Sequence, residues 1–170
     1  MNHPVRTGRT TEEMPRFALT IYQPWASLII AGAKPFEFRP YRLPANYVGQ
    51  RIIIHAAGKK LDVAETRETL SRLMAGGEVA ARTCLEPELA IPVLQQILDD
   101  AARGSVINGV ALGEATFGEA VRGRAIADHF GYRVGQHDTN WGWPLSDIKA
   151  WPEPIVARGF QGIWQWGREK

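Results

Sequence analysis

The chain has 170 residues, of which 45% are hydrophobic, so it is long enough to form one domain around a single core. Its formal net charge of +2 permits nucleic-acid binding without requiring it, because strong non-specific binders carry denser runs of Lys and Arg. The only cysteine, Cys84, excludes an intrachain disulfide and favours a reducing compartment, and we therefore expect a cytoplasmic protein.

The N-terminal segment is polar and lacks the apolar region of a secretory signal peptide. No run in the chain approaches the roughly 20 apolar residues that a membrane-spanning helix needs, so we expect no membrane partner. We expect residues 1–16 to be a disordered tail and residues 17–170 to form a single domain.

Short strands and a few helices are predicted along the first two thirds of the chain. The patterns favour a strand over 17–21, a mostly buried helix over 24–31, a strand over 35–39 and a central strand over 51–56. A helix is expected over 61–74, ended by two glycines, and another over 86–102, which Pro92 should kink or split.

The last third of the chain is expected to complete a sheet. A strand is predicted over 106–116, with a bulge at Gly113, and residues 123–140 are expected to form a mobile insertion or lid. One further strand is expected around either 143–145 or 148–150, and a last strand over 163–166 closes the sheet. With 17 glycines and 11 prolines for turns, these elements fit an α+β barrel.

The densest group of candidate functional residues lies at one predicted helix-to-strand corner. An apolar, helix-like run stops at Gly32, Lys34 follows, and residues 36–39 alternate between phenylalanine and a charged residue. In a strand, the two phenylalanines would enter the core, while Glu37 and Arg39 would share the opposite face. On this pattern alone, a surface ion-pair cluster is slightly favoured over a functional site.

The same segment resembles the signature of the ASCH domain family, a branch of the PUA-like superfamily. The family pattern Gly-x-Lys-x-x-Glu-x-Arg is matched by Gly32, Lys34, Glu37 and Arg39, after a Gln-Pro-Trp-Ala lead-in. Three further matching blocks follow in the family's order, at 52–57, 104–109 and 159–164. The resemblance runs from about residue 17 to the C-terminus and implies a PUA-like mixed β-barrel flanked by short helices.

The resemblance also implies a function, because ASCH and PUA-like domains are generally associated with RNA and some with modified or flipped bases. We therefore expect RNA or a modified nucleoside as the partner, bound in a cleft at this corner. The expected binding residues are Gln23, Trp25, Lys34, Glu37, Arg39 and His55. An aromatic plane beside amide and charged groups suits a nucleobase and its phosphate. Trp141, Trp143 and Tyr132 could form the opposing wall.

A small hydrolase is the alternative. Some relatives resemble amidohydrolases of N4-acylated cytidines that use Thr, Lys and Glu, and Lys34 matches their lysine. Their threonine nucleophile falls at Glu37, which puts that activity in doubt, because a carboxylate replaces an activated hydroxyl poorly. Other relatives resemble metal-independent ribonucleases, in which Lys34 would stabilise charge at phosphorus and Glu37 would act as the base. A protein-interaction module is a third interpretation.

Motifs for cofactors and metals are missing from the sequence. It contains neither a Gly-x-Gly-x-x-Gly nor a Walker pattern, so we expect no nucleotide cofactor. His129 and His137, with Asp128 and Asp138, are interpreted as a polar loop rather than a metal site. The oligomeric state stays open, and a monomer is compatible with the sequence.

Overall fold

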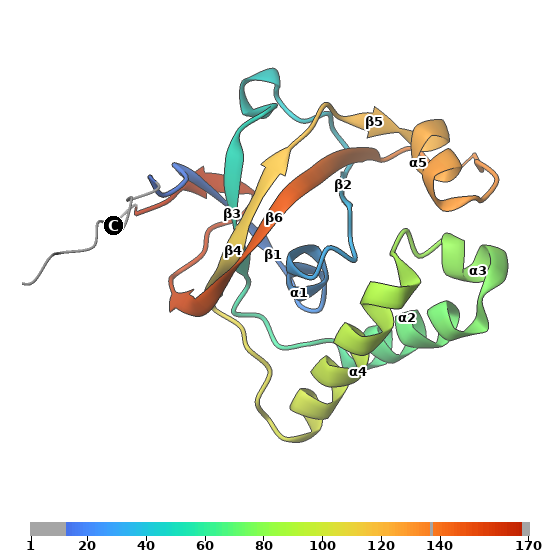
Figure 1. Ribbon diagram of the computed structural model, residues 1–170, viewed down its shortest axis with the longest axis horizontal. Helices are drawn as coiled ribbons and strands as arrows, with labels where there is room; N and C mark the ends of the chain where they lie inside the picture. Colours follow the sequence, from blue (N-terminus) through green and yellow to red (C-terminus); the bar gives the residue numbers. More distant parts are fainter. Residues whose placement is uncertain (1–12, 137, 168–170) are drawn as a thin grey trace, which may run out of the picture.

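The computed structural model describes residues 13–136 and 138–167. Its centre is one curled, mixed sheet with the strand order β2-β6-β4-β3-β1-β7, with β5 paired to β6 (Figure 1). The strands are β1 (Phe17–Ile21), β2 (Phe36–Arg39), β3 (Arg51–Ala56), β4 (Val110–Phe117), β5 (Val121–Arg122), β6 (Trp141–Val156) and β7 (Ile163–Gln165). The curled sheet and its helices confirm the expected α+β fold with a mixed, barrel-like sheet.

The helices fall into two groups. The short α1 (Trp25–Ile30) lies within the curl of the sheet, while α2 (Val63–Ala75), α3 (Gly77–Ala81) and α4 (Pro87–Ala102) form a layer to one side, and α5 (Gly123–Phe130) lies beyond β5 (Figure 1). A single 3-10 turn spans Ala45–Tyr47. None of the described helices is long and apolar enough to cross a membrane.

The strand β6 produces the curl because it belongs to both halves of the sheet. Its first residues pair with β2 and β5, and most of its length pairs with β4. The ladder between β4 and β6 shifts register twice, and Asp147 adopts a positive φ of 48°. Such irregularities bend a strand and increase its twist. Both alternatives predicted for this region, 143–145 and 148–150, therefore lie in one long strand.

Two predicted segments take a more regular form than the sequence indicated. Pro92 lies inside α4 without interrupting it, because the buried Ala90 and Leu94 pack in a cluster with Leu28 and Leu73, which holds the helix together despite one lost backbone hydrogen bond. The segment 123–140, expected to be a mobile insertion or lid, begins with α5.

The helix α5 is held by packing and by its C-terminal cap. Ile126 and Ala127 are buried, and the backbone N–H of Gly131, in the left-handed conformation, donates to the carbonyl of Ala127. His137 lies outside the described residues.

Two residues at the end of the predicted N-terminal tail lie against the folded domain. Residues 1–12 of the expected tail lie outside the described residues. Pro15 is buried, and the carbonyl of Arg16 accepts a 2.9 Å hydrogen bond from the backbone N–H of Trp166. The last two positions of the expected tail therefore contact the folded domain.

Gly113 marks a bulge, as predicted. The register between β3 and β4 shifts beside it, and a Cβ built on this residue would lie 2.3 Å from the backbone oxygen of Lys149. Only a residue without a side chain fits between these strands. The bulge sets how β4 bends between β6 and β3, and β3 contributes His55 to the candidate site.

Candidate functional site

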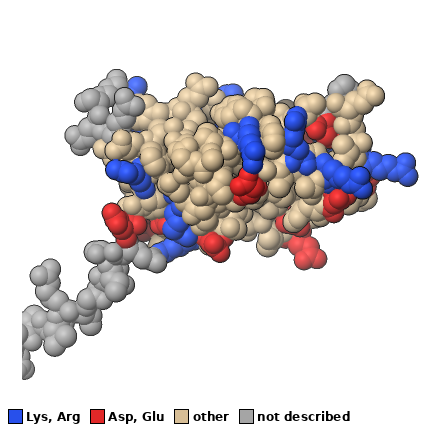
Figure 2. All heavy atoms as spheres, turned by 90° about the horizontal axis from the view of Figure 1, so that it is seen from above, with Lys and Arg blue, Asp and Glu red and all other residues tan. Residues whose placement is uncertain are grey.

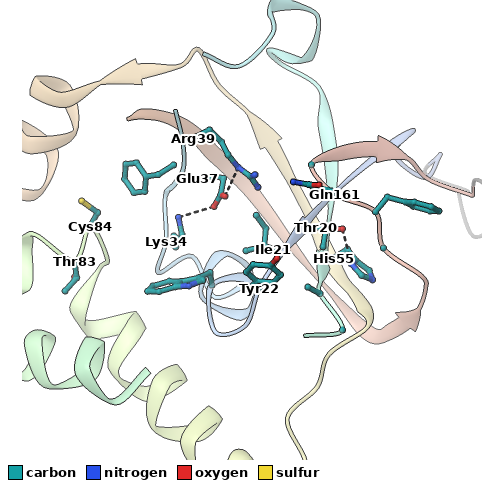
Figure 3. A pocket seen from close by; sticks show the side chains of 17 residues that line it. Thr20, Ile21, Tyr22, Lys34, Glu37, Arg39, His55, Thr83, Cys84 and Gln161 are labelled. Carbon is teal, nitrogen blue, oxygen red and sulfur yellow. Dashed lines mark hydrogen bonds and ion pairs between the residues drawn. The ribbon is translucent and has the colours of Figure 1, made fainter. Parts of the chain in front are cut away.

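A cavity of about 810 Å³ opens on the inner side of the curled sheet. Side chains from β1, β2, β3 and the 159–162 loop line it, together with the turn before α1 and residues 83–84 (Figure 3). Its volume lies within the range of about 300–1,000 Å³ that small-molecule sites occupy. The cavity is therefore large enough for a nucleotide.

The end of α1 delivers Lys34 to the cavity. The chain reverses at Gly32, whose φ is +75°, and its backbone N–H donates to the carbonyl of Ile29. The N–H groups of Ala33 and Lys34 both donate to the carbonyl of Leu28, which closes the helix end. Because Gly32 turns the chain here, Lys34 enters the cavity just before β2, as predicted.

Lys34, Glu37 and Arg39 form a continuous charged cluster on the cavity wall. Lys34 Nζ lies 3.3 Å from Glu37 Oε2 and donates to the carbonyl of Phe36, while Arg39 Nε lies 3.1 Å from Glu37 Oε1 (Figure 3). The side chains of Lys34 and Glu37 are only 8% and 11% exposed. Glu37 therefore holds both cations, and the cluster keeps one net positive charge when Lys34 is protonated.

Burial sets the electrostatics of Lys34. Desolvation lowers the pKa of its ammonium group below the ordinary value of 10.5, and the adjacent Glu37 opposes that shift. Its Nζ also lies 4.9 Å from the centroid of the Phe38 ring. The lysine is thus a partly destabilised cation in a low-dielectric wall, a state that further negative charge in the cavity would stabilise.

Arg39 has unused hydrogen-bonding capacity. Its Nε is buried and has no hydrogen-bond partner among the described residues, although it lies close to Glu37. Figure 3 shows its guanidinium pointing away from Lys34, toward the side chain of Gln161 on the opposite wall. Because Nε is engaged in the ion pair with Glu37, the terminal nitrogens of the guanidinium are the donors that suit an acceptor supplied by a ligand.

The opposite wall contains a chain of hydrogen bonds through Thr20 and His55. Trp164 Nε1 donates to Thr20 Oγ1 at 2.9 Å, and Thr20 Oγ1 lies 3.3 Å from His55 Nδ1. His55 Nε2 lies 2.9 Å from the carbonyl oxygen of Ala157, which can only accept, so Nε2 carries the proton. Nδ1 then accepts from the threonine hydroxyl, and burial lowers the pKa of His55, which favours this neutral form.

Gly159 leaves room for that hydrogen-bond chain. A Cβ at this position would lie 2.5 Å from His55 Nδ1 and 2.8 Å from Thr20 Oγ1. The pairing of β1 with β3 places Thr20 directly beside His55 in a parallel register. The second wall is therefore neutral, polar and closely packed.

Aromatic rings surround the charged cluster. Tyr22, Trp25, Phe38 and Phe160 all line the cavity. Tyr22 is 56% exposed, with Lys59 Nζ 4.6 Å from its ring centroid. These rings offer flat apolar surface next to hydrogen-bonding groups, which is what stacking and edge recognition of a base require.

Most of the sequence-predicted site residues meet in the cavity. Trp25, Lys34, Glu37, Arg39 and His55 all line it.

Gln23 is 5% exposed and is not among the lining residues. Its amide nitrogen donates to Ser27 Oγ and to the carbonyl of Ile107, and its oxygen accepts from the backbone N–H of Ser27. It therefore tethers the start of α1, and the geometry does not support a binding role.

The predicted opposing wall was also wrong. Trp143 is 1% exposed and belongs to the main core, where its Nε1 donates to the carbonyl of Tyr41. Tyr132 lines an adjoining cavity of about 220 Å³ that shares Cys84 with the first, and its hydroxyl lies 3.6 Å from Cys84 Sγ. Trp141 lies at the edge of the barrel, under two arginines. The actual opposing wall consists of Thr20, the predicted binding residue His55 and the 159–162 loop. The sequence motifs marked that loop only as part of a family block.

No metal centre is evident in the described part of the chain. No group of three or more His, Cys, Asp or Glu side chains within residues 13–136 and 138–167 could hold an ion. His129 Nε2 instead lies 3.0 Å from Glu86 Oε1.

Comparison with known proteins defines the class to which this fold and site belong. Residues 19–116 match the model of the ASCH domain, and the chain belongs to the ASCH domain family. No curated protein matches the chain.

Solved structures of similar fold include two mutants of ZmASCH, an ASCH protein from Zymomonas mobilis. One is 13% identical, covers 89% of this chain and 90% of its own, and has a TM-score of 0.45. The other is 14% identical, covers 84% of this chain and 76% of its own, and has a TM-score of 0.41.

Proposed function

We propose that this ASCH-domain protein binds RNA, or a modified nucleobase within it, by seating one nucleotide in the cavity. The observation that carries the proposal is the cluster of Lys34, Glu37 and Arg39, which leaves one net positive charge inside a wall of aromatic rings. A nucleotide within RNA has one negative charge on its phosphate, which matches the positive charge, and one flat base, which matches the aromatic rings.

Each part of the cluster has a distinct role in this proposal. Arg39 contacts the phosphate through the terminal nitrogens of its guanidinium, because the residue lines the cavity while its Nε faces Glu37. Glu37 holds both cations in place, and its charge opposes the lowering of the Lys34 pKa by burial. Trp25 and Tyr22 supply stacking surface, and Gln161 reaches polar atoms of the base or sugar.

The test is a titration of labelled single-stranded RNA of mixed sequence at low salt. Arg39→Gln and Lys34→Met should each weaken binding at least about tenfold, because each removes a desolvated charge contact. Arg103→Ala is the control, since it removes a 62% exposed arginine at the C-terminal end of α4, which is not among the residues that line the cavity. If mixed RNA and modified nucleosides all fail to bind at low salt, the proposal is wrong.

A hydrolase is the second candidate, favoured by the lowered pKa of Lys34 directly beside a carboxylate. Such a pair can transfer a proton or stabilise charge that develops in a transition state. Mass spectrometry of single-stranded RNAs and acylated cytidines, incubated with wild type or with Lys34→Met, tests this candidate. Products that form only with wild type would establish turnover and identify the bond cleaved.

A further inference from the structure

We propose a second binding site beside the cavity, which holds the nucleotides that flank the one seated inside. This rim site consists of Tyr41, Arg42, Arg122 and Trp141. It rests on the proposed function and narrows it, because it requires a single-stranded RNA of several nucleotides rather than a free nucleoside or nucleobase.

The strand register connects the rim site to the cavity. Arg39 in β2 pairs with Trp141 in β6, and Arg122 in β5 pairs with the same tryptophan from the other side. Residues directly opposite one another in antiparallel strands project from the same face. Arg39, Trp141 and Arg122 therefore form a row across two strand spacings, about 10 Å. A ligand that contacts both ends must extend beyond one base.

The arginines of the rim site are positioned on an aromatic support. The guanidinium carbon of Arg122 lies 4.8 Å from the Trp141 ring centroid, and that of Arg42 lies 5.7 Å from it. Arg122 also donates to the carbonyl of Thr139 at 3.0 Å, which fixes its orientation. Among the described residues, Arg122 makes no ion pair. Its charge is thus held in place and available to a phosphate.

Tyr41 adds an exposed ring to this surface. It is 51% exposed, and its ring lies edge-on to the buried Trp143 with centroids 5.6 Å apart. Its carbonyl accepts a 3.1 Å hydrogen bond from Trp143 Nε1, which fixes the backbone at this position. An aromatic ring that is anchored yet open to solvent is the platform on which an unpaired base stacks.

Charge favours RNA over a protein partner here. Within the described part of the chain, the one acidic side chain paired with the rim site is Glu119, which contacts Arg42 while both side chains are about 60% exposed. Figure 2 views the molecule from above, the side on which β5 and α5 lie in Figure 1, and shows Lys and Arg side chains projecting across that surface. Positive charges interleaved with rings match a backbone of phosphates that carries unstacked bases.

Length-dependent binding tests the rim site separately from the cavity. Affinities of nucleoside monophosphates and of mixed-sequence RNAs of two to eight nucleotides are measured with wild type, Arg122→Ala and Tyr41→Ala. Tyr41→Phe is the matched control, because it keeps the ring, and Arg103→Ala removes an equal charge from α4.

Wild type should bind the longer RNAs at least about tenfold more tightly than a monophosphate, as stacking of one more base predicts. Tyr41→Ala should remove most of this gain, and Tyr41→Phe should keep it. Arg122→Ala should lower the gain about threefold or more and reduce the salt slope of binding by about 0.7, the value for one phosphate contact on a single strand.

The outcomes separate the two proposals. Equal affinity for monophosphate and longer RNA, or an unchanged length dependence in both rim variants, overturns the rim site while leaving the cavity proposal intact. Length-dependent binding that survives Lys34→Met but is lost in the rim variants supports the rim site and contradicts the cavity proposal. Absence of binding to every RNA and nucleotide overturns both.

Discussion

Replacing Glu37 by glutamine tests how the charged cluster is stabilised. The substitution keeps the shape of the side chain but removes the negative charge that lies 3.3 Å from Lys34 and 3.1 Å from Arg39. Lys34 is then left buried beside another cation. We expect the variant to be less stable at neutral pH, because an uncompensated buried charge is costly.

The largest cost attributable to Lys34 can be worked out from its titration. A buried lysine can always escape its penalty by losing a proton, which costs about 1.36 kcal/mol for each unit between the pH and its ordinary pKa of 10.5. The destabilisation caused by burying Lys34 therefore cannot exceed about 5 kcal/mol at pH 7 and about 2 kcal/mol at pH 9. Because burial lowers the folded-state pKa, the penalty is largest at low pH and decreases as pH rises through that pKa.

Urea unfolding of wild type and Glu37→Gln at both pH values measures this effect. We expect a loss of about 3–5 kcal/mol at pH 7 that shrinks by roughly 2 kcal/mol at pH 9. Glu114→Gln is the matched control, since Glu114 is equally buried at 8% exposure but pairs with Arg51 at 2.8 Å. An arginine does not deprotonate in this range, so the cost of the control should stay constant.

Either of two results would refute this reasoning. Equal losses at pH 7 and pH 9 for Glu37→Gln would mean that Lys34 is not the source of the penalty. A variant as stable as wild type at pH 7 would mean that the cluster is hydrated enough to need no carboxylate, and the assignment of Arg39 as a desolvated phosphate contact would lose its basis.

Three further substitutions test the second wall and the sheet. Burial lowers the folded-state pKa of His55 below its ordinary 6.5, so the unfolded chain binds the extra proton more readily. The wild-type free energy of unfolding should therefore fall by up to about 1.4 kcal/mol for each pH unit below about 6.5. Thermal melts from pH 7.5 to 5 should show that His55→Gln lacks this pH dependence. Gly159→Ala should weaken RNA binding in titrations, because its Cβ would displace His55 and Thr20. Gly113→Ala should cost about 1–3 kcal/mol in urea unfolding, since its Cβ would overlap a backbone oxygen.

The charged corner was predictable because its signals are local. The sequence predicts that a helix ends at Gly32, that Lys34 follows, and that residues 36–39 form a strand. The structure has each of these features. The alternation could not reveal which face would be buried. Phe36 packs at the edge of the sheet against Phe130 and His129, while Glu37 lies on the inner face opposite Trp143.

That reversal has a physical reason. In a sheet with one solvent face, alternation assigns charged residues to the outside. Here the sheet curls, so its inner face encloses a cavity and α5 covers part of the other face. Neither the curl nor α5 is visible in a four-residue pattern, and the ion-pair cluster predicted for a surface therefore lies in a nearly buried wall.

Of the second wall only His55 was predicted, because the rest depends on long-range pairing. Thr20 and His55 become neighbours only through the parallel register of β1 and β3, and Gly159 reaches them from a loop more than a hundred residues further along the chain. Trp141 and Trp143, in contrast, were assigned to this wall for being aromatic and close in sequence. One lies at the barrel edge and the other in the core.

The two walls together restrict the class of ligand more than either does alone. The wall with Lys34 and Arg39 favours an anion, and inorganic phosphate would satisfy it. The wall with Thr20 and His55 is neutral and has its hydrogen bonds already directed, with both ring nitrogens of His55 engaged. Such a wall can contact the base and the sugar, while the phosphate stays on the charged wall. A nucleotide should therefore displace a bound phosphate ion readily, and the affinity gained from the base measures what the neutral wall and the aromatic rings contribute.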